Sequence, residues 1–423
     1  MTADVVLPVP AVGAGAAVAW VRTHLGDLTD DDVAASPAVR GGQRAADRRL
    51  AKFDVAGYAA RRNEIWPPDR RGASALSPYV RHGLVSLPAL WRHVEGGPVR
   101  DVTKYRDELL WQEYARHLYA RFGSSMPRAT RFAVSLRTPD GPPTAGDGWP
   151  RDLACLDLTV GELERDGWVP NQARLWLASH WAVRGGLGWR DGEDLFFRHL
   201  LDGSRAANRL GWAWTVGAGT GKPYGFARRQ VENRAPGLCA GCALRDDCPI
   251  ESWPAIAAPD PQLDADPRWR HDPDLIGTTG PTAPDVAYTA RADPPASLPK
   301  AVWLTAESLG DDDPALVAHR DLPAVFVFDA PLLARLRLDP RRLVFLAETL
   351  ADLGTRREVR VLRGDPRTAL AGQQLAATYA PVPGWRARAQ VLRPAVVHPW
   401  PWLAPPHAGP VGSFSAWRAA GRW

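Results

Sequence analysis

The stretch that decides the fold of this chain lies between residues 167 and 254. It begins GWVPNQARLWLASHWAV (167–183), continues GWRDGEDLFFRHLLDGSRAANRLGWAW (188–214) and closes LCAGCALRDDCPIESWP (238–254). Apolar and aromatic residues recur there at helical spacing, and the polar turn Asp202-Gly203-Ser204 interrupts the pattern. Three of the four cysteines then follow within ten residues. An ordinary core does not need so many indoles beside a thiol cluster, so we predict the floor of a redox cofactor site.

The composition describes a globular chain of more than one domain. At 423 residues, two domains are expected rather than one core. The net charge of +5 permits an acidic partner such as DNA without requiring one. Tryptophan is the outlier, with 19 residues against 8 Tyr and 10 Phe, and this excess favours stacking or electron relay. Compositional bias, also visible in Ala, Arg and Pro, explains part of it.

The sequence carries no pattern typical of export or membrane insertion. The first residues contain Asp4 and no basic region before the Ala/Val-rich start, which argues against a signal peptide. No apolar run approaches the ~18 residues that a membrane helix requires. We therefore expect a cytoplasmic protein without membrane contact, and a monomer. Cysteines in that compartment are better suited to metal ligation than to disulfides.

Two segments upstream of the opening stretch carry candidate binding residues. The pattern over residues 103–119 predicts a helix with Glu108, Trp111, Gln112 and Arg116 on one side. An earlier loop delivers Ser74, Leu76 and Ser77 to the start of another helix. Hydroxyl groups beside free N–H groups suit a phosphate, although an ordinary helix N-cap is the alternative interpretation.

The last third of the chain changes pattern. Buried-strand runs occur at Ala301–Thr305, Ala324–Ala330 and Val359–Asp365, with a helical pattern between the last two. Strands that alternate with helices predict a small, Rossmann-like parallel α/β domain. The preceding Asp-, Pro-, Thr- and Ala-rich segment reads as a linker. We therefore predict an all-helical domain, a linker and an α/β domain, in the order 1–260, 261–297 and 298–423.

Taken together, these motifs resemble the DNA photolyase/cryptochrome family, with the domain order reversed. The α/β motifs that carry the resemblance are DPAL (313–316), RRLVFLAETLADLG (341–354), VLRGDP (361–366) and FSAWR (414–418). In the family, an α/β antenna domain usually precedes the helical FAD-binding domain. The resemblance therefore implies a circular permutation, which exposed linkers tolerate. The family's arginine-rich loop after the first strand is absent, so the question of whether an antenna pigment binds stays open.

The resemblance also implies a set of FAD-binding residues. Tyr58 and the segment 72–77, with Ser74, Leu76 and Ser77, resemble the phosphate-gripping loop, although Ala73 replaces a Thr. Arg174 and Asp202 resemble the ion pair that flanks the isoalloxazine, and Asn208 resembles the residue that faces flavin N5. Gln112 stands where an Arg is common. Trp212 and Trp189 match the proximal and middle members of the electron-transfer chain, and the distal member is unassigned.

The cysteines resemble those of the iron–sulfur bacterial photolyases and cryptochromes. The spacing C-x2-C-x5-C-P places Cys239, Cys242 and Cys248 together, with Cys155 far upstream. Four thiolates satisfy a 4Fe–4S cluster and leave no cysteine over. A structural Zn site with four Cys ligands is the alternative.

The resemblance further implies a lesion-binding set and a reaction. Where the iron–sulfur group has a His-His pair that serves repair of the (6-4) photoproduct, this chain reads Val169-Pro170-Asn171. Asn171 instead resembles the enzymes that act on cyclobutane dimers. Glu108 and Trp111 resemble the carboxylate that binds the lesion and the indole that stacks on the flipped dimer.

We therefore expect a blue-light-driven, FAD-dependent lyase that splits cyclobutane pyrimidine dimers in UV-damaged DNA. A cryptochrome-like photoreceptor, photoreduced through Trp212 and Trp189, is the alternative. A relative that binds flavin without either activity is a third hypothesis.

Overall fold

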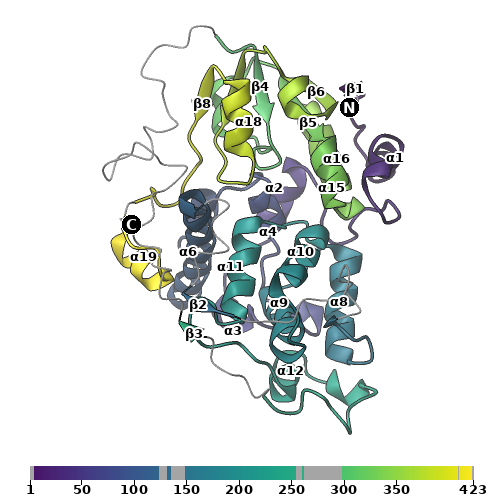
Figure 1. Cartoon of the computed structure of the whole chain (residues 1–423), viewed down its shortest axis with the longest axis vertical. Helices are drawn as coiled ribbons and strands as arrows, with labels where there is room; N and C mark the ends of the chain where they lie inside the picture. The colour runs from purple at the N-terminus through teal and green to yellow at the C-terminus, as the bar shows by residue number, and fades with distance from the viewer. Residues whose placement is uncertain are drawn as a thin grey trace.

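The computed structural model describes residues 4–122, 131–134, 148–253, 260–261, 298–407 and 409–421. Within them, a body of helices lies against one end of a six-stranded sheet (Figure 1). This mixed, helix-rich architecture agrees with the expected combination of helical and α/β parts. Apart from residue 261, the predicted linker 261–297 lies outside the described residues.

The sheet has the strand order β1-β6-β5-β4-β7-β8. Neighbouring strands run parallel, except that β1 is antiparallel to β6. The three predicted strand runs are confirmed as β4, β5 and β6, whereas the short β7 and β8 were not predicted. The bounds are β1 Val5–Leu7, β4 Ala301–Leu304, β5 Ala324–Asp329, β6 Val359–Gly364, β7 Leu375–Thr378 and β8 Val396–His398.

The first residues of the chain pack with this sheet. Val5 pairs with Arg363, and Leu7 pairs with Val361. Helix α1 (Ala14–Leu25) follows and lies beside α16 (Pro340–Gly354) (Figure 1). The predicted first domain, residues 1–260, therefore begins with a segment that belongs to the sheet by its hydrogen bonds.

The helices of the lower body carry the predicted site residues, and the helix predicted over 103–119 is confirmed within α6. The bounds before the sheet are α2 Gln43–Ala51, α3 Tyr58–Arg61, α4 Ser77–Arg81, α5 Leu87–His93, α6 Val99–Phe122, α8 Ala154–Asp166, α9 Asn171–Ala178, α10 Trp189–His199, α11 Arg205–Thr215 and α12 Arg228–Arg234. The 3-10 turns are η1 Gly26–Leu28, η2 Pro68–Arg70 and η5 Cys239–Gly241, and η4 Ser179–Arg184 is a π-helical segment.

The remaining elements surround the sheet or follow it: α14 Pro314–Ala318, α15 Ala330–Leu336, α17 Pro366–Ala369, α18 Trp385–Leu392 and α19 Phe414–Ala420. A separate pair, β2 Phe132–Ala133 and β3 Asp260–Pro261, is antiparallel. No helix in the described part of the chain combines the length and the apolar character that a bilayer crossing requires.

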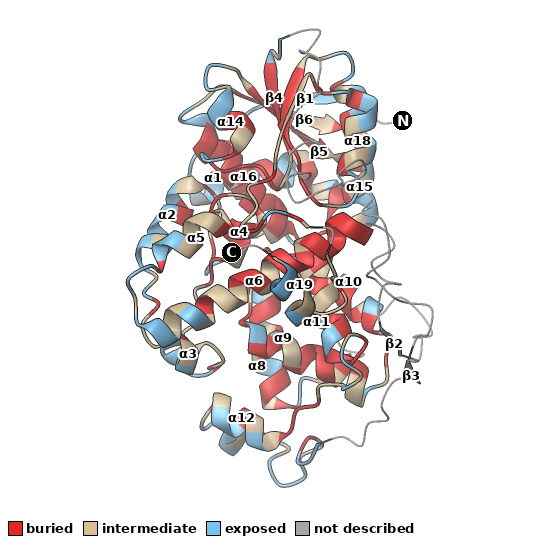
Figure 2. Cartoon of the chain, turned by 90° about the vertical axis from the view of Figure 1, so that its left-hand side faces the viewer, coloured by how far each residue is buried: buried red, intermediate tan, exposed pale blue. Residues whose placement is uncertain are grey.

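One core joins the sheet to the first helices. Buried side chains of β5, α16 and α4 belong to the same cluster, for example Phe328, Phe345 and Tyr79 (Figure 2). A second core is rich in indoles and lies among the lower helices, with Trp149, Trp176, Trp181, Trp189 and Trp212 as members. Helix α16 is buried between sheet and helices, so it sets how the two parts meet.

The N-terminus of α2 docks directly on α16. Backbone N–H groups of Gly41, Gly42 and Gln43 donate to the side chains of Glu348, Thr349 and Asp352. A Cβ at residue 41 would lie 2.2 Å from the carbonyl oxygen of Phe345, so glycine is required for this approach. Acidic and hydroxyl acceptors at a helix N-terminus satisfy its free N–H groups and favour its dipole.

The end of the chain returns across α6, and we call residues 400–421 the C-terminal strap. Oε1 of the buried Glu113 accepts from the N–H groups of Leu403 (2.6 Å) and Ala404 (3.0 Å). The Tyr114 hydroxyl donates to the carbonyl of Val411 at 2.7 Å. Helix α19 therefore lies beside α6, far from the sheet that precedes it in sequence (Figure 1).

Glu113 should make stability depend on pH. Burial raises its pKa to about 7, although Arg116 and the two N–H groups favour the charged form. Because the unfolded pKa is lower, the folded chain holds more protons between the two values, and stability falls as pH rises through that window. In Glu113→Gln, the loss of unfolding free energy between about pH 5 and pH 8 should be smaller than in the wild type by roughly 1–3 kcal/mol. Urea unfolding at several pH values measures it, and parallel profiles for the two proteins would contradict this prediction.

Candidate functional site

A cavity opens where the helices meet the sheet. Three predicted residues line it: Ser77, Gln112 and Asp202. Arg116, on the same predicted helix as Gln112, and Ser204, in the predicted polar turn, line it as well. Sequence reasoning missed the rest of the lining, because it comes from segments that only the fold brings together: Arg81, Ala206, Glu307, Pro381, Val382 and Trp400.

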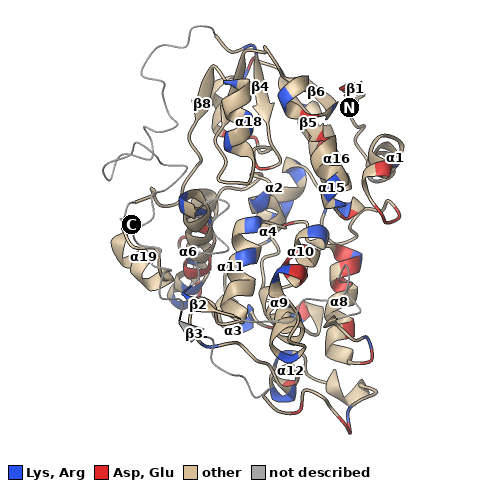
Figure 3. Ribbon diagram, viewed as in Figure 1, with Lys and Arg blue, Asp and Glu red and all other residues tan. Residues whose placement is uncertain are grey.

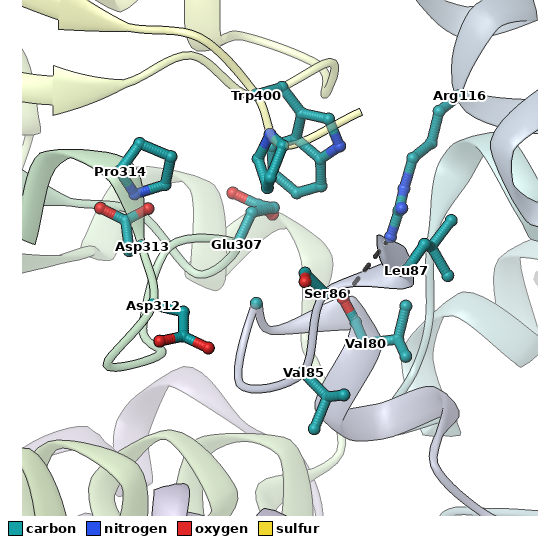
Figure 4. A pocket seen from close by; sticks show the side chains of 12 residues that line it. Val80, Val85, Ser86, Leu87, Arg116, Glu307, Asp312, Asp313, Pro314 and Trp400 are labelled. Carbon is teal, nitrogen blue, oxygen red and sulfur yellow. Dashed lines mark hydrogen bonds between the residues drawn. The ribbon is translucent and has the colours of Figure 1, made fainter. Parts of the chain in front are cut away.

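A second cavity adjoins the first and shares Arg116, Glu307 and Trp400 with it (Figure 4). The Arg116 guanidinium lies 5.0 Å from the centre of the Trp400 ring, a cation–π distance. In Figure 4 Arg116 descends from α6, while Trp400 comes from the segment after β8. The C-terminal part of the chain therefore supplies one wall of the site.

The turn Asp202-Gly203-Ser204 positions the polar end of the cavity. Oδ2 of Asp202 accepts from the Arg174 guanidinium at 2.7 Å, so the predicted ion pair is present. Ser204 then caps α11, because its hydroxyl accepts from the N–H of Ala207. A buried carboxylate needs such a partner, since an isolated charge is costly away from water.

Two arginines hold the middle of this turn. The Gly203 carbonyl accepts from Nε of Arg81 at 2.9 Å and from the Arg342 guanidinium at 3.3 Å. Arg81 also pairs with Glu307 at 2.6 Å. A Cβ at residue 203 would lie 2.9 Å from Arg342 Nη1 and from two backbone oxygens, which explains the glycine.

Three buried polar atoms, one in the turn and two on α11, have no hydrogen-bond partner within the described residues. They are Oδ1 of Asp202, Nδ2 of Asn208 and Nε1 of Trp212. A buried polar atom left unsatisfied costs about 1–3 kcal/mol. One acceptor and two donors on a turn and the following helix therefore fit a ligand that offers both kinds of group.

The two predicted relay indoles lie on packed helices. Trp212 of α11 presses on Gly192 of α10, where a Cβ would lie 2.2 Å from its ring. Trp189 begins α10 and is buried, with the Arg190 guanidinium 5.1 Å from its ring centre. Trp212 also meets Phe196 edge to face at 5.1 Å.

The hydroxyl groups of the predicted phosphate loop already form hydrogen bonds within the protein. The Ser77 hydroxyl accepts from Nε1 of Trp168 at 3.0 Å, and Leu76 is buried at the start of α4. The N–H of Leu76 lies 3.4 Å from the Ser74 hydroxyl. Tyr58 stands edge-on to Tyr105 at 4.9 Å, and burial raises its pKa. Tyr58, Ser74 and Leu76 are not among the residues that line the cavity.

The predicted lesion-binding residues lie outside the cavity lining. Glu108 pairs with Lys104 at 2.9 Å and with Arg62 at 3.4 Å, and its side chain is 35% exposed. Trp111 is half-buried against the C-terminal strap, and Asn171 is exposed at the start of α9.

All four cysteines face one apolar cavity at the other end of the helical body. Cys155 of α8 is buried there, and Cys239, Cys242 and Cys248 are half-buried. Burial, and then the neighbouring thiols, raise the pKa of Cys155 to about 12. Within the described residues, no group of three or more His, Cys, Asp or Glu side chains is placed to hold a metal ion. The metal set therefore stays a prediction.

Residues 105–229 match a family model described as the FAD binding domain of DNA photolyase. This segment contains Gln112, Arg174, Asp202, Asn208 and Trp212, which are the residues of the polar turn and its surroundings. The match supports a place in the photolyase/cryptochrome family. FAD is the cofactor that this domain type binds, and the unsatisfied atoms beside Asp202 fit its mixed donors and acceptors.

Individual photolyases are similar to part of this chain. The deoxyribodipyrimidine photo-lyase of Synechococcus is 28% identical over 203 residues, which cover 43% of this chain and 40% of that protein. The same enzyme of Thermus thermophilus is 31% identical over 197 residues, or 44% of this chain and 46% of the relative. The chain thus spans less than half of the length of these relatives.

Solved structures give weaker similarity. A class III photolyase from Agrobacterium tumefaciens has a TM-score of 0.37 and 24% identity, with 45% of this chain and 42% of that chain covered. A Synechocystis cryptochrome has a TM-score of 0.41 and 22% identity, with 47% and 44% covered. Scores of this size do not by themselves assign the fold.

The turn can be tested with two glycines. Gly203→Ala should lower the unfolding free energy by about 1–3 kcal/mol and reduce bound flavin, because its Cβ has no room beside Arg342. The matched control is Gly211→Ala in α11, whose Cβ would meet nothing within 4 Å and should be neutral or stabilising. Denaturant unfolding and flavin absorbance measure both effects. Equal behaviour of the two variants would contradict this account of the turn.

Proposed function

We propose that this chain is an FAD-dependent, light-driven lyase that splits cyclobutane pyrimidine dimers in UV-damaged DNA. The observation that carries the proposal is the match over residues 105–229, which falls on a buried polar turn with unsatisfied atoms. Reduced FAD, when bound, supplies on blue-light excitation the electron that opens the dimer and that afterwards returns.

Residues of the chain would hold the FAD in place. Asp202 and Arg174 form a neutral pair at the polar end of the cavity, so no net charge is buried beside the flavin. The Asn208 amide can donate or accept as the flavin's protonation changes. Tyr58, Ser74, Leu76, Ser77 and Gln112 complete the proposed FAD set, by resemblance to the family.

DNA would bind through its phosphates and present the lesion to α6. Figure 3 marks basic residues along the ribbon of α2, α4 and α12, and α2 carries Arg44, Arg48 and Arg49. Such groups bind the backbone of nucleic acids without reading sequence. Glu108 would then hydrogen-bond the flipped dimer, Trp111 would stack on it, and Asn171 would complete the contact.

We also propose a 4Fe–4S cluster held by Cys155, Cys239, Cys242 and Cys248. The four thiols face one cavity with apolar walls, and soft thiolates suit iron–sulfur clusters. A zinc ion with the same ligands is the alternative. Either would tie α8 to a segment more than eighty residues later in the sequence.

The proposed domain order is a circular permutation of the family's arrangement. The segment that matches the FAD-binding domain precedes the strands of the sheet, apart from β1. Strand β4, the first of the C-terminal strands, lies inside the sheet with β5 and β6 on one side and β7 and β8 on the other. This order supports a Rossmann-like domain as the last unit of the chain.

A cryptochrome-like photoreceptor is the second candidate. The buried Trp212 and Trp189, on the packed helices α11 and α10, favour it because such indoles could reduce the flavin in light. Retention of Glu108 and Trp111 favours the lyase.

Repair can be measured directly on DNA that carries a defined thymine dimer. The anaerobically reduced, flavin-loaded protein should restore thymines under blue light and not in darkness. Glu108→Ala should lower the yield about ten- to a hundredfold, since a charged hydrogen bond to the lesion is lost. Glu164→Ala, which removes a carboxylate 45% exposed on α8, should have no effect. A flavin-loaded, photoreducible wild type that repairs nothing would favour the photoreceptor.

The cluster is tested by metal content and melting. The wild type should contain about four iron atoms per chain. Cys242→Ala should lose iron and lower the melting temperature, because a ligand that joins two distant segments is removed. A wild type with about one zinc would select the alternative. Unchanged metal content and melting in Cys242→Ala would contradict both.

A further inference from the structure

The indole of Trp111 lies flat on the ring of Phe414. The two ring centres are 4.0 Å apart and their planes differ by 10°. Trp111 comes from the middle of α6, whereas Phe414 is the first residue of α19 in the C-terminal strap. A parallel pair at this separation covers one face of the indole.

Phe414 stands on a firmly attached helix. Trp417, one turn further along α19, is fully buried, and its Nε1–H donates to Nδ1 of His117 at 2.9 Å. Because that Nδ1 accepts, the proton of a neutral His117 is on Nε2, which then donates to the Ala404 carbonyl at 3.1 Å. Ser413 caps the helix by accepting from the N–H of Ala416. The contacts of α19 therefore hold the ring of Phe414 in place without help from Trp111.

The same contacts argue against the idea that Phe414 and α19 form a cover that moves away from Trp111. A cover that opened would have to withdraw Trp417 from the core and break its bond to His117. It would also break the Tyr114 bond to the Val411 carbonyl, and Tyr114 meets the rings of both Trp111 and Phe414 edge to face. The attachment extends along the described part of the strap, since Arg121 donates to the carbonyls of His407 and Gly409.

We propose that Phe414 is a positioning residue for the lesion. It fixes the plane of the Trp111 indole so that the opposite face receives the flipped pyrimidine dimer. This inference rests on the proposed function and deepens it. An indole already held in its binding orientation loses less rotational freedom when the dimer arrives, so the preference for damaged DNA rises.

The test is the affinity for DNA with and without one thymine dimer, measured in darkness with the flavin-loaded protein. Phe414→Ala should reduce the preference for dimer DNA about three- to tenfold, which corresponds to the interaction energy of one aromatic pair. The affinity for undamaged DNA should not change. Phe414→Tyr should retain the preference. In a Trp111→Ala background, Phe414→Ala should add nothing, because the indole that it positions is gone.

Arg418→Ala is the matched control on the same helix. It removes the exposed pair with Asp107 (2.7 Å) and leaves the stacked rings intact, so the preference for dimer DNA should not change. If Arg418→Ala and Phe414→Ala lower the preference equally, a loosened helix explains both and the positioning role is wrong.

The remaining outcomes separate this inference from the proposed function. A wild type that prefers dimer DNA, with an equal or stronger preference in Phe414→Ala, would overturn the positioning role alone, and a stronger preference would identify Phe414 as a cover. A wild type that does not distinguish dimer DNA from undamaged DNA would overturn the lyase proposal, and the positioning role with it.

Discussion

The carbonyl group of Gly203 is the point on which the arrangement of this protein depends. Arg81 reaches it from α4, and Arg342 reaches it from α16, which packs against the sheet. Hydrogen bonds from charged donors are stronger than neutral ones, and a buried guanidinium needs acceptors of this kind. Burial and the neighbouring Arg81 lower the pKa of Arg342. This peptide group thus adds a polar junction to the core and to the α2–α16 contacts that join the helical body to the sheet.

The cavity follows from this junction. The Gly203 contacts fix the backbone on either side, so Asp202 faces Arg174 and Ser204 starts α11. Glu307 enters from the loop after β4 because it pairs with Arg81. Since the walls are joined by side-chain and backbone contacts rather than by chain continuity, the order of the domains along the sequence matters little to the geometry. The proposed permutation is therefore compatible with a site of this kind.

The sequence was sufficient where local patterns are strong. The strands β4, β5 and β6 are continuous apolar runs, α6 has a long helical pattern, and the Asp-Gly-Ser turn stands between two helices with indoles on both sides. The strands β7 and β8, with four and three residues, lack such a conspicuous apolar run and were missed. The pairing of β1 with β6 was also invisible, because it joins residues more than three hundred positions apart.

Long-range contacts explain the rest of what sequence could not predict. Nothing near Trp400 or Glu307 in the sequence indicates that they line a cavity with Gln112. Trp111 was expected to stack on a flipped dimer, and its stacking partner within the chain, a residue 303 positions later, was not foreseen. The roles of Glu108, Asn171 and the four cysteines stay predictions, since they rest on resemblance and not on contacts within the fold.

The most direct test of this account is an experimentally determined structure of the protein with FAD bound. We predict the isoalloxazine against the Asp202–Arg174 pair, with Oδ1 of Asp202 and Nδ2 of Asn208 hydrogen-bonded to the cofactor or to water beside it. A flavin bound elsewhere, with both atoms still unpartnered, would contradict the assignment of this turn as the centre of the site.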